Sequence, residues 1–315
     1  MNGSSSVATT RFSLWRIGDI LLMAGISIGY LLLSYILIGF RPEQVFLLAV
    51  VNLLYFISKG TRKFIIGSSI FVVYWIIFDY MKAFPNYRYA PVHIESLYNL
   101  EKSIFGIMQN GVRLTPNEFW LRHSNTFFDV MAGSFYLTWI PVPLMFATYL
   151  FYKNRQQFIY FSMTFFLVNM LGFIIYYVCP AAPPWYVQEH GFVFNEHTAC
   201  GIAGLGRFDQ FFHVEIFKGL YSKSSNVFAA MPSLHSAYPT IVFYYSLKNK
   251  MGYMRILFAI IMLGVWFAAV YTSHHYVLDV LAGITCAATG ILLFNWLANK
   301  TRFSGFVQRM VKLTS

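Results

Sequence analysis

Residues 256–298 read ILFAIIMLGVWFAAVYTSHHYVLDVLAGITCAATGILLFNWLA. The apolar runs 256–273 and 275–298 each come close to the ~20 residues that a helix needs to cross a bilayer. Only a short polar turn separates the two runs, so we expect a pair of antiparallel membrane helices. His275 lies at this turn, and Asp279 follows it by one helical turn on the same helix face.

Similar apolar runs occur along the whole chain. We place further spans near 20–40, 64–81, 127–151, 158–179 and 231–247. A shorter run at 45–58 is either a short span or a re-entrant element. The 315 residues are 57% hydrophobic and only 11% charged, which is incompatible with the surface of a soluble domain. The sequence therefore predicts an all-α polytopic membrane helix bundle with about eight spans.

Basic residues alternate with the spans. Lysine and arginine cluster at both ends of the chain and in the connections 59–63, 153–155 and 248–255. The positive-inside rule makes these parts cytoplasmic, so the long segments 82–126 and 180–230 lie outside. The basic residues of these cytoplasmic parts explain the net charge of +11. Because the basic clusters are short and separated, nucleic acid is not expected as a partner.

A second histidine, His235, opens another apolar run in MPSLHSAYP (231–239). The predicted topology places it on the same outer face as His275. An imidazole attacks phosphorus only through a nitrogen that carries a lone pair, and a carboxylate that holds the other N–H fixes this tautomer. Asp279 is spaced to do so for His275, and His235 can serve the leaving oxygen as an acid. We therefore predict a catalytic set of His235, His275 and Asp279.

A phosphate site is expected beside these histidines. Ser233 stands at the start of the helix that carries His235, where unpaired N–H groups attract anions. None of the histidine spacings matches a metal site, so we expect neither a metal ion nor a cofactor. A segment with helical spacing of apolar residues, near 94–108, either lies in the membrane interface or covers the bundle.

Four motifs, in this order, carry a resemblance to a known family: CPAAPPWY (179–186), GLGRFDQFF (204–212), FAAMPSLHS (228–236) and SHHYVLDVLAG (273–283). They resemble the inositol phosphorylceramide synthase branch, the aureobasidin-resistance proteins, of the type 2 phosphatidic acid phosphatase superfamily. FDYMKAF followed by VHIESLYNLEKSIFG is similar to a region of bacterial members. The resemblance covers roughly residues 70–295.

The resemblance implies a six-helix lipid-phosphatase-like core. We expect N-terminal membrane helices at 1–63, a catalytic membrane domain at 64–298 and a basic cytoplasmic tail at 299–315. It further implies a bacterial inner-membrane protein whose active site faces the periplasm. The oligomeric state stays open.

The resemblance also implies a reaction. An inositol-phosphate head group would pass from a phosphatidylinositol-type donor to ceramide or dihydroceramide, by way of a phosphohistidine, with release of diacylglycerol. The chain lacks the lysine-arginine motif of the phosphatases, and fewer cations favour a phosphodiester with a single charge. A lipid-phosphate phosphatase and a non-enzymatic transporter remain the alternatives.

Five residues are candidates for substrate contact. Arg207 is the candidate phosphate clamp, although a surface pair of Arg207 with Asp209 would explain it equally. The other candidates are Ser233, His274, Trp185 and Tyr186.

Overall fold

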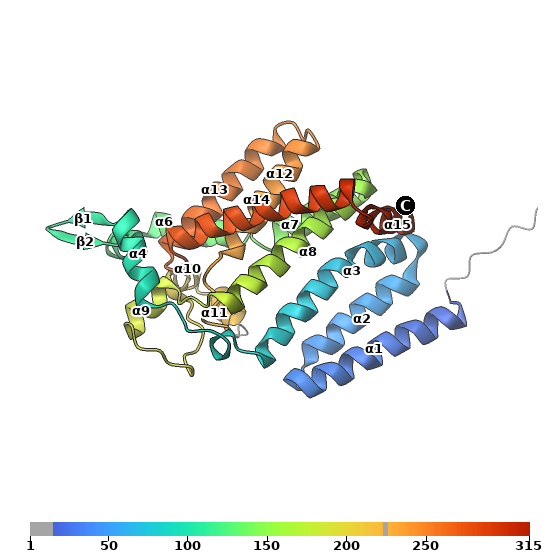
Figure 1. Ribbon diagram of the computed structural model, residues 1–315, viewed down its shortest axis with the longest axis horizontal. Helices are drawn as coiled ribbons and strands as arrows, with labels where there is room; N and C mark the ends of the chain where they lie inside the picture. Colours follow the sequence, from blue (N-terminus) through green and yellow to red (C-terminus); the bar gives the residue numbers. More distant parts are fainter. Residues whose placement is uncertain (1–14, 223–225) are drawn as a thin grey trace, which may run out of the picture. The chain divides into compact units, whose positions relative to one another are not determined.

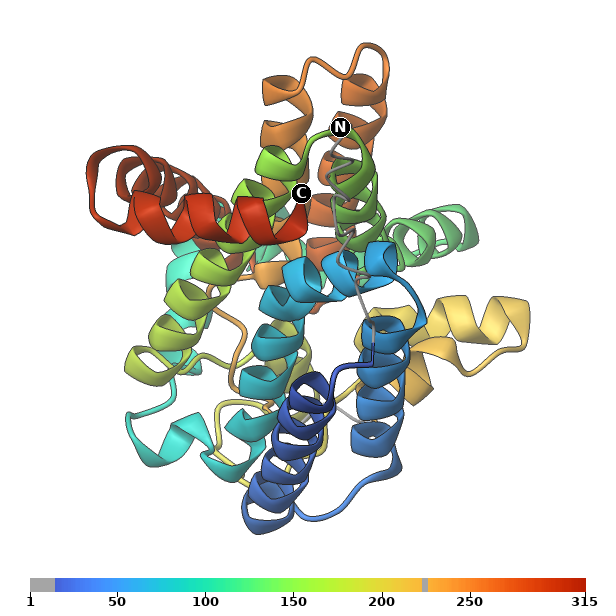
Figure 2. The same cartoon turned by 90° about the vertical axis from the view of Figure 1, so that its right-hand side faces the viewer.

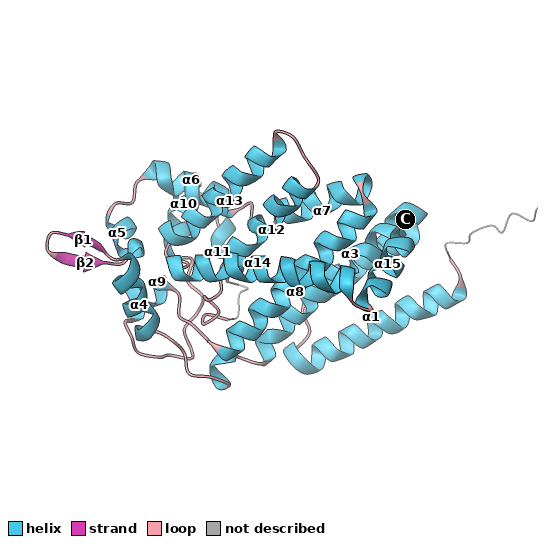
Figure 3. Cartoon of the chain, turned by 45° about the horizontal axis from the view of Figure 1, so that its top comes forward, coloured by secondary structure: helices cyan, strands magenta, loops and turns pink. Residues whose placement is uncertain are grey.

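The computed structural model describes residues 15–222 and 226–315. Nearly all of the secondary structure is helical (Figures 1 and 3). Within the described ranges the only strands are β1 (Ile107–Gln109) and β2 (Val112–Leu114), which form one small antiparallel hairpin. The prediction of an all-α polytopic membrane bundle is confirmed.

Six helical segments are long and apolar enough to cross a membrane: Ile17–Ile38, Lys59–Ala83, Thr126–Lys153, Arg155–Val178, Met254–Tyr271 and Val277–Lys300. They contain α1 (Ile17–Ile38), α3 (Lys59–Tyr80), α6 (Thr126–Tyr136), α7 (Pro141–Lys153), α8 (Arg155–Val178), α13 (Met254–Tyr271) and α14 (Val277–Lys300). Two further apolar helices, α2 (Pro42–Ile57) and α12 (Leu234–Lys248), are shorter. All eight predicted runs are therefore apolar helical elements, of which six have full spanning length.

The expected single helix at 127–151 is interrupted. α6 ends at Tyr136 and α7 begins at Pro141, with a turn between them. Proline lacks an N–H, and its ring clashes with the carbonyl four residues before it, so Pro141 and Pro143 start a new helix in place of continuing the old one. The apolar run concealed this break, because hydropathy is the same on both sides.

The chain divides into two compact units, and the boundary lies within α3, after Ser69. In the first unit the Arg62 guanidinium pairs with Asp19 at 2.9 Å and donates to the Tyr55 carbonyl, which ties the start of α3 to α1 and α2. The three predicted domains stay a prediction. Residues 1–14 of the first of them lie outside the described residues. The predicted tail contains α15 (Phe303–Thr314).

The second unit is built around α8, α12, α13 and α14 (Figure 1). α8 contributes the largest buried face, and its polar residues bond to neighbouring helices: Thr164 to Tyr245 and Asn169 to Tyr238. These helices bring the start of α12 and the turn between α13 and α14 to the same end of the bundle. The two predicted catalytic histidines lie there.

The two long outer segments cover this end of the bundle. The first contains α4 (Glu95–Phe105), the β hairpin and α5 (Pro116–Arg122). The buried face of α4 packs on the start of α14. Of the two alternatives for this segment, a helix in the membrane interface or a cover on the bundle, the structure shows the cover. The helix ends at Phe105, and Met108 belongs to β1, not to a helix. The second segment contains α9 (Pro184–His190), α10 (Gly206–Phe212) and α11 (Ile216–Tyr221).

Candidate active site

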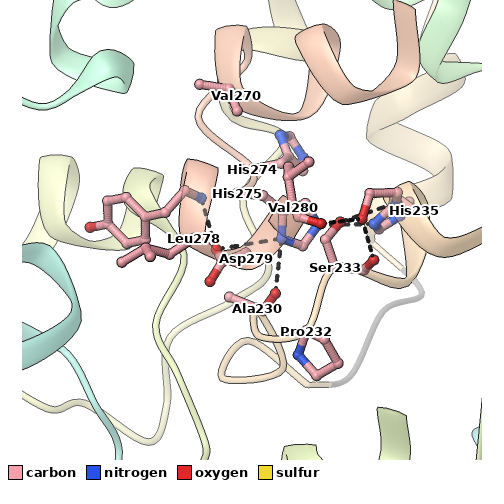
Figure 4. A network of polar contacts seen from close by, with 12 residues as sticks. Ala230, Pro232, Ser233, His235, Val270, His274, His275, Leu278, Asp279 and Val280 are labelled. Carbon is pink, nitrogen blue, oxygen red and sulfur yellow. Dashed lines mark hydrogen bonds and ion pairs between the residues drawn. The ribbon is translucent and has the colours of Figure 1, made fainter. Parts of the chain in front are cut away.

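His275 lies in the turn between α13 and α14 and is 5% exposed. Its Nδ1–H donates to the Ala230 carbonyl at 2.9 Å. Its Nε2 atom therefore carries the lone pair, and it lies 3.0 Å from Nδ1 of His235 (Figure 4). The side chains of the two histidines thus meet, as the sequence predicts, with the nucleophilic nitrogen of His275 facing His235.

Asp279 is fully buried beside His275. Its Oδ2 atom lies 3.7 Å from Nδ1 of His275 and accepts a 2.7 Å hydrogen bond from the Tyr276 N–H. The carboxylate is occupied because it caps the helix on which it stands. The Ala230 carbonyl therefore holds the tautomer of His275. The direct bond to Asp279 that the sequence predicts is not formed. Asp279 thus lies behind the ring without a direct hydrogen bond to it.

His235 is fixed by the way in which α12 begins. Ser233 is the N-cap of α12, and its backbone N–H donates to the Asp279 carbonyl at 2.9 Å. A Cβ atom at Gly283 would lie 2.1 Å from the Ser233 carbonyl oxygen, so only glycine permits this approach of α12 to α14. Ser233 is fully buried, and both its hydroxyl and its N–H are already bonded within the protein, so its contact with a phosphate stays a prediction.

Aromatic rings line the other side of the histidines. Trp139 packs on His235 with ring centroids 4.4 Å apart, and Tyr136 contacts both His235 and His274. Tyr221 packs on His274 at 4.7 Å. The sequence analysis missed Trp139 and Tyr136, because aromatic residues in an apolar run have no distinguishing signal.

His274 lies beside the pair, next to His275 in the chain. It is 5% exposed, and its Nδ1 atom contacts Thr272. Its Nε2 atom is buried and has no hydrogen-bond partner within the described part of the chain. Because Nδ1–H faces the Thr272 carbonyl, Nε2 carries a lone pair and can accept a hydrogen bond from a substrate hydroxyl.

Arg207 pairs with Asp129, not with Asp209. Its Nε–H donates to Asp129 Oδ1 at 2.6 Å, and the Tyr271 hydroxyl donates to the same oxygen. The Asp209 carboxylate accepts instead from two N–H groups at the start of α11. Arg207 Nη2 is buried and bonds to none of the residues that the structure describes, so one nitrogen of the predicted clamp is still available.

Trp185 and Tyr186 support the covering loop. The Trp185 N–H donates to the Ser273 carbonyl at 3.0 Å, next to His274. Tyr186 is fully buried, and its hydroxyl donates to the Val193 carbonyl and accepts from the Asn195 N–H. Substrate contact by these two residues stays a prediction. The Tyr186 hydroxyl is already bonded within the loop, and Trp185 is held there through its backbone.

Two further residues, which no sequence motif singles out, hold the turn of His275. Glu101 of α4 is fully buried and accepts hydrogen bonds from the Val277 and Leu278 N–H groups, at 3.0 and 3.1 Å. Asn117 of α5 donates through Nδ2 to the His275 carbonyl at 2.9 Å. A glutamate on the apolar side of an amphipathic helix was the one available signal.

The site favours neutral imidazoles. Burial lowers the pKa of His275 to about 4, although its hydrogen bond to the Ala230 carbonyl opposes the shift. Burial, together with the neighbouring His275, lowers the pKa of His274 to about 3. His275 is therefore uncharged at neutral pH, as a nucleophile must be. Residues 15–222 and 226–315 contain no group of three or more His, Cys, Asp or Glu side chains that could hold a metal ion.

Two paired histidines at one end of a membrane helix bundle, with a carboxylate behind one of them, are typical of a membrane protein of the lipid-phosphatase type. Comparison with known proteins agrees. The family model of the PAP2 superfamily matches residues 99–293. The chain is 44% identical, over 89% of its length and 93% of the relative's, to the phosphoinositol dihydroceramide synthase of Bacteroides thetaiotaomicron.

Two fungal proteins are more distant relatives. The inositol phosphorylceramide synthase catalytic subunit of Saccharomyces cerevisiae is 26% identical over 72% of this chain and 56% of its own. The inositol phosphorylceramide synthase of Candida albicans is 30% identical over 49% of this chain and 34% of its own. No solved structure matches the chain. The chain belongs to the PAP2 superfamily and, within it, to the family of the Bacteroides synthase.

Proposed function

We propose that this protein is a sphingolipid synthase. It transfers an inositol-phosphate head group from a phosphatidylinositol-type donor to ceramide or dihydroceramide and releases diacylglycerol. One observation carries the proposal: His275 Nε2, with its tautomer held by the Ala230 carbonyl, lies 3.0 Å from the Nδ1 atom of His235. The names of the relatives supply the substrate class.

In the first step the Nε2 atom of His275 attacks the phosphorus of the donor. The N–P bond forms while the bond from phosphorus to the diacylglycerol oxygen breaks. His235 enters this step as the imidazolium, donates a proton to that oxygen and is left as the neutral imidazole. The product on the enzyme is a phosphohistidine that bears inositol. The ring of His275 becomes cationic in this step, and the Asp279 carboxylate 3.7 Å away stabilises the new charge.

In the second step His235 removes the proton from the primary hydroxyl of the acceptor. The hydroxyl oxygen attacks phosphorus, the N–P bond breaks, and His275 returns to its neutral form. The same residue acts first as acid and then as base, as microscopic reversibility requires.

The phosphate has two candidate partners, the buried Nη2 of Arg207 and the backbone N–H groups at the start of α12, after Ser233. The buried Nε2 of His274 is a candidate acceptor for a substrate hydroxyl. One cationic side chain suits a phosphodiester, which carries one negative charge. Because basic residues cluster in the connections at the opposite end of the bundle, we place the site at the outer face of a bacterial inner membrane.

A transfer assay tests the proposal. The purified protein is reconstituted in vesicles that contain head-group-labelled phosphatidylinositol and ceramide, and the products are separated into lipid and water-soluble fractions. We expect labelled inositol phosphorylceramide and an equal amount of diacylglycerol, with little free inositol phosphate. A His275→Ala protein is the matched control and should make none of these products. Predominantly water-soluble inositol phosphate from the unaltered protein would show a hydrolase instead, and no turnover would favour the transporter.

A further inference from the structure

Three short helices reach sideways from the catalytic end of the bundle. They are α6, α10 and α11, and we call them the lateral shelf (Thr126–Tyr136, Gly206–Phe212 and Ile216–Tyr221). Figure 2 shows α10 and α11 extending away from the other helices, with α6 next to them. The shelf is packed, not loosely attached, because Gly133 of α6 leaves just enough room for the Phe208 ring of α10.

The inner end of the shelf is part of the active-site wall. The Tyr221 hydroxyl of α11 donates to the Tyr136 hydroxyl of α6 at 3.2 Å. The same two tyrosine rings pack on His274, and Tyr136 also packs on His235. The shelf therefore leads from the histidines to the outside of the bundle.

The outer surface of the shelf is apolar. Five large side chains are between 41% and 71% exposed: Phe127, Phe211, Phe212, Ile216 and Leu220. Within α11, Ile216 and Leu220 are four residues apart and share one face. A monomeric soluble surface seldom gathers so many exposed large apolar side chains on adjoining short helices.

The opposite surface of the shelf is polar. Lys218 pairs with Glu215, and both line a surface cavity of about 480 Å³ together with Asp209, Gln210 and His213. α10 and α11 are thus amphipathic as a unit, with water on one side and apolar side chains on the other. This is the pattern of helices that lie in a membrane interface.

The level of the shelf is set by its contacts with a span. Asp129 of α6 bonds to Arg207 of α10 and to Tyr271, the last residue of α13. The Arg207 guanidinium also lies over the Tyr271 ring. α13 ends here, at the turn that carries His275. The shelf therefore lies at the height at which a spanning helix leaves the bilayer, on the side of the catalytic pair.

We propose that the lateral shelf is inserted into the membrane leaflet that faces the histidines, and that lipid substrate reaches the site along it. Acyl chains contact Phe127, Phe211, Phe212, Ile216 and Leu220, while head groups and water contact the polar surface. The delivery of substrate rests on the proposed function; the insertion of the shelf into lipid does not.

Insertion is tested by lipid-dependent fluorescence quenching. Single cysteines at Phe211, Ile216, Gln210 and Lys218, in a protein whose native cysteines are replaced by serine, are labelled with bimane in vesicles. Lipids with a nitroxide on the acyl chain, just below the head group, should quench the labels at 211 and 216 at least threefold more than those at 210 and 218. Equal, weak quenching at all four positions would place the shelf in water. Labels at 211 and 216 that are shielded from water yet not quenched by the lipid would indicate a protein partner. Either result would overturn the proposal.

Delivery is tested by kinetics of a Phe211→Ser/Ile216→Ser double variant. In vesicles we expect its apparent KM for long-chain ceramide to rise about fivefold or more, with kcat within twofold of normal. Its KM for a water-soluble short-chain ceramide should not change, because that acceptor does not need the leaflet. Leu292→Ser, on α14 and 70% exposed, is the matched control and should leave both constants unchanged.

Two outcomes would separate the ideas. A fall in kcat with both acceptors would mean that the double variant damages the site itself, and the shelf would not be a delivery surface. Quenching at 211 and 216 in a protein that makes no sphingolipid would refute the proposed function and leave the insertion intact.

Discussion

Two groups contact or approach Nδ1 of His275, where the sequence predicts the Asp279 carboxylate alone. The Ala230 carbonyl accepts the Nδ1–H at 2.9 Å and fixes the tautomer, whereas Asp279 lies 3.7 Å from that nitrogen. In the proposed mechanism Asp279 stabilises a charge that exists only after the ring has attacked phosphorus. An interaction that strengthens only along the reaction lowers the barrier and leaves substrate binding unchanged.

His275→Ala should abolish transfer, because it removes the nucleophile. Asp279→Asn should lower kcat about 10²-fold and leave KM within a few fold, since the carbonyl still holds the tautomer while the negative charge is lost. Steady-state kinetics in vesicles measure both effects. His197→Ala, a highly exposed histidine outside the site, is the control and should be fully active. Normal turnover by a folded, membrane-inserted His275→Ala protein would refute the mechanism.

Arg207 permits a second prediction at this scale. If Nη2 clamps the phosphate, Arg207→Gln should lower kcat/KM by roughly 10²-fold, the usual loss for a positioned cationic donor. Asp129→Asn removes the partner of Arg207 but keeps the guanidinium, so it should lower kcat/KM less than tenfold. If the two variants lost activity equally, the ion pair would be structural and the clamp would have to be sought elsewhere.

At the scale of elements, the covering segment positions the catalytic turn. α4 contributes Glu101, which holds the first N–H groups of α14, and α5 contributes Asn117, which holds the His275 carbonyl. Both residues act through the backbone of the turn. An amphipathic helix that covers a bundle thus also fixes the geometry of the nucleophile.

Glu101 should give the stability of the protein a measurable pH dependence. Burial raises the pKa of its carboxyl to about 7, although the hydrogen bonds from Val277 and Leu278 oppose the shift. A carboxyl with a raised pKa binds its proton more tightly in the folded state, so the stability it contributes is present below about pH 4.5 and is lost as the pH rises through about 7. The lowered pKa values of His274 and His275 make their contribution to stability rise with pH, which opposes the effect of Glu101. The effect of Glu101 is therefore measured against a protein that differs only at this residue.

The matched protein is Glu101→Gln. Melting temperatures in detergent between pH 5 and pH 8 should fall by a few degrees more in the unaltered protein than in Glu101→Gln. Kinetics give a second test. Glu101→Ala should lower kcat by ~10–10²-fold with KM nearly unchanged, because a displaced turn misplaces the nucleophile. Glu101→Gln should retain much of the activity that Glu101→Ala loses. Parallel melting curves for the unaltered and Gln proteins would remove the assigned role of the carboxyl.

At the scale of the whole molecule, the second unit separates its candidate active site from its clustered basic residues. Both histidines, the covering segments and the lateral shelf lie at one end of its helices, while the basic connections 153–155 and 248–255 lie at the opposite ends of α8, α12 and α13. This separation lets a reaction between two membrane lipids take place beside the leaflet that holds them. The positive-inside rule predicts that the end with the histidines lies outside.

Sidedness can be measured directly. In a background without native cysteines, Glu196→Cys in the outer loop should react with a membrane-impermeant thiol reagent added to intact cells. Tyr253→Cys, in the exposed turn between α12 and α13, should react only after the cells are opened. The reverse pattern would place the active site in the cytoplasm.

Local properties of the chain were enough to predict much of this protein. Apolar runs are local, so they predict the membrane helices. They miss the break at Pro141 that divides one run into α6 and α7, and they do not show that α12 is shorter than a full span. The HHYVLD spacing is local as well, so it predicts that His275 and Asp279 share a face. Together with the histidine motif around His235, these signals identify the candidate catalytic residues before any contact is known.

Only the tertiary structure shows what holds these residues in place. The Ala230 carbonyl is 45 residues from His275 in the chain, Asn117 is 158 residues from it, and Glu101 is 176 residues from Val277. Arg207 finds Asp129, 78 residues away, and not the nearby Asp209. A buried polar group must find a partner wherever the fold supplies one. Sequence spacing says nothing about such partners, because the packing of helices decides which distant groups meet.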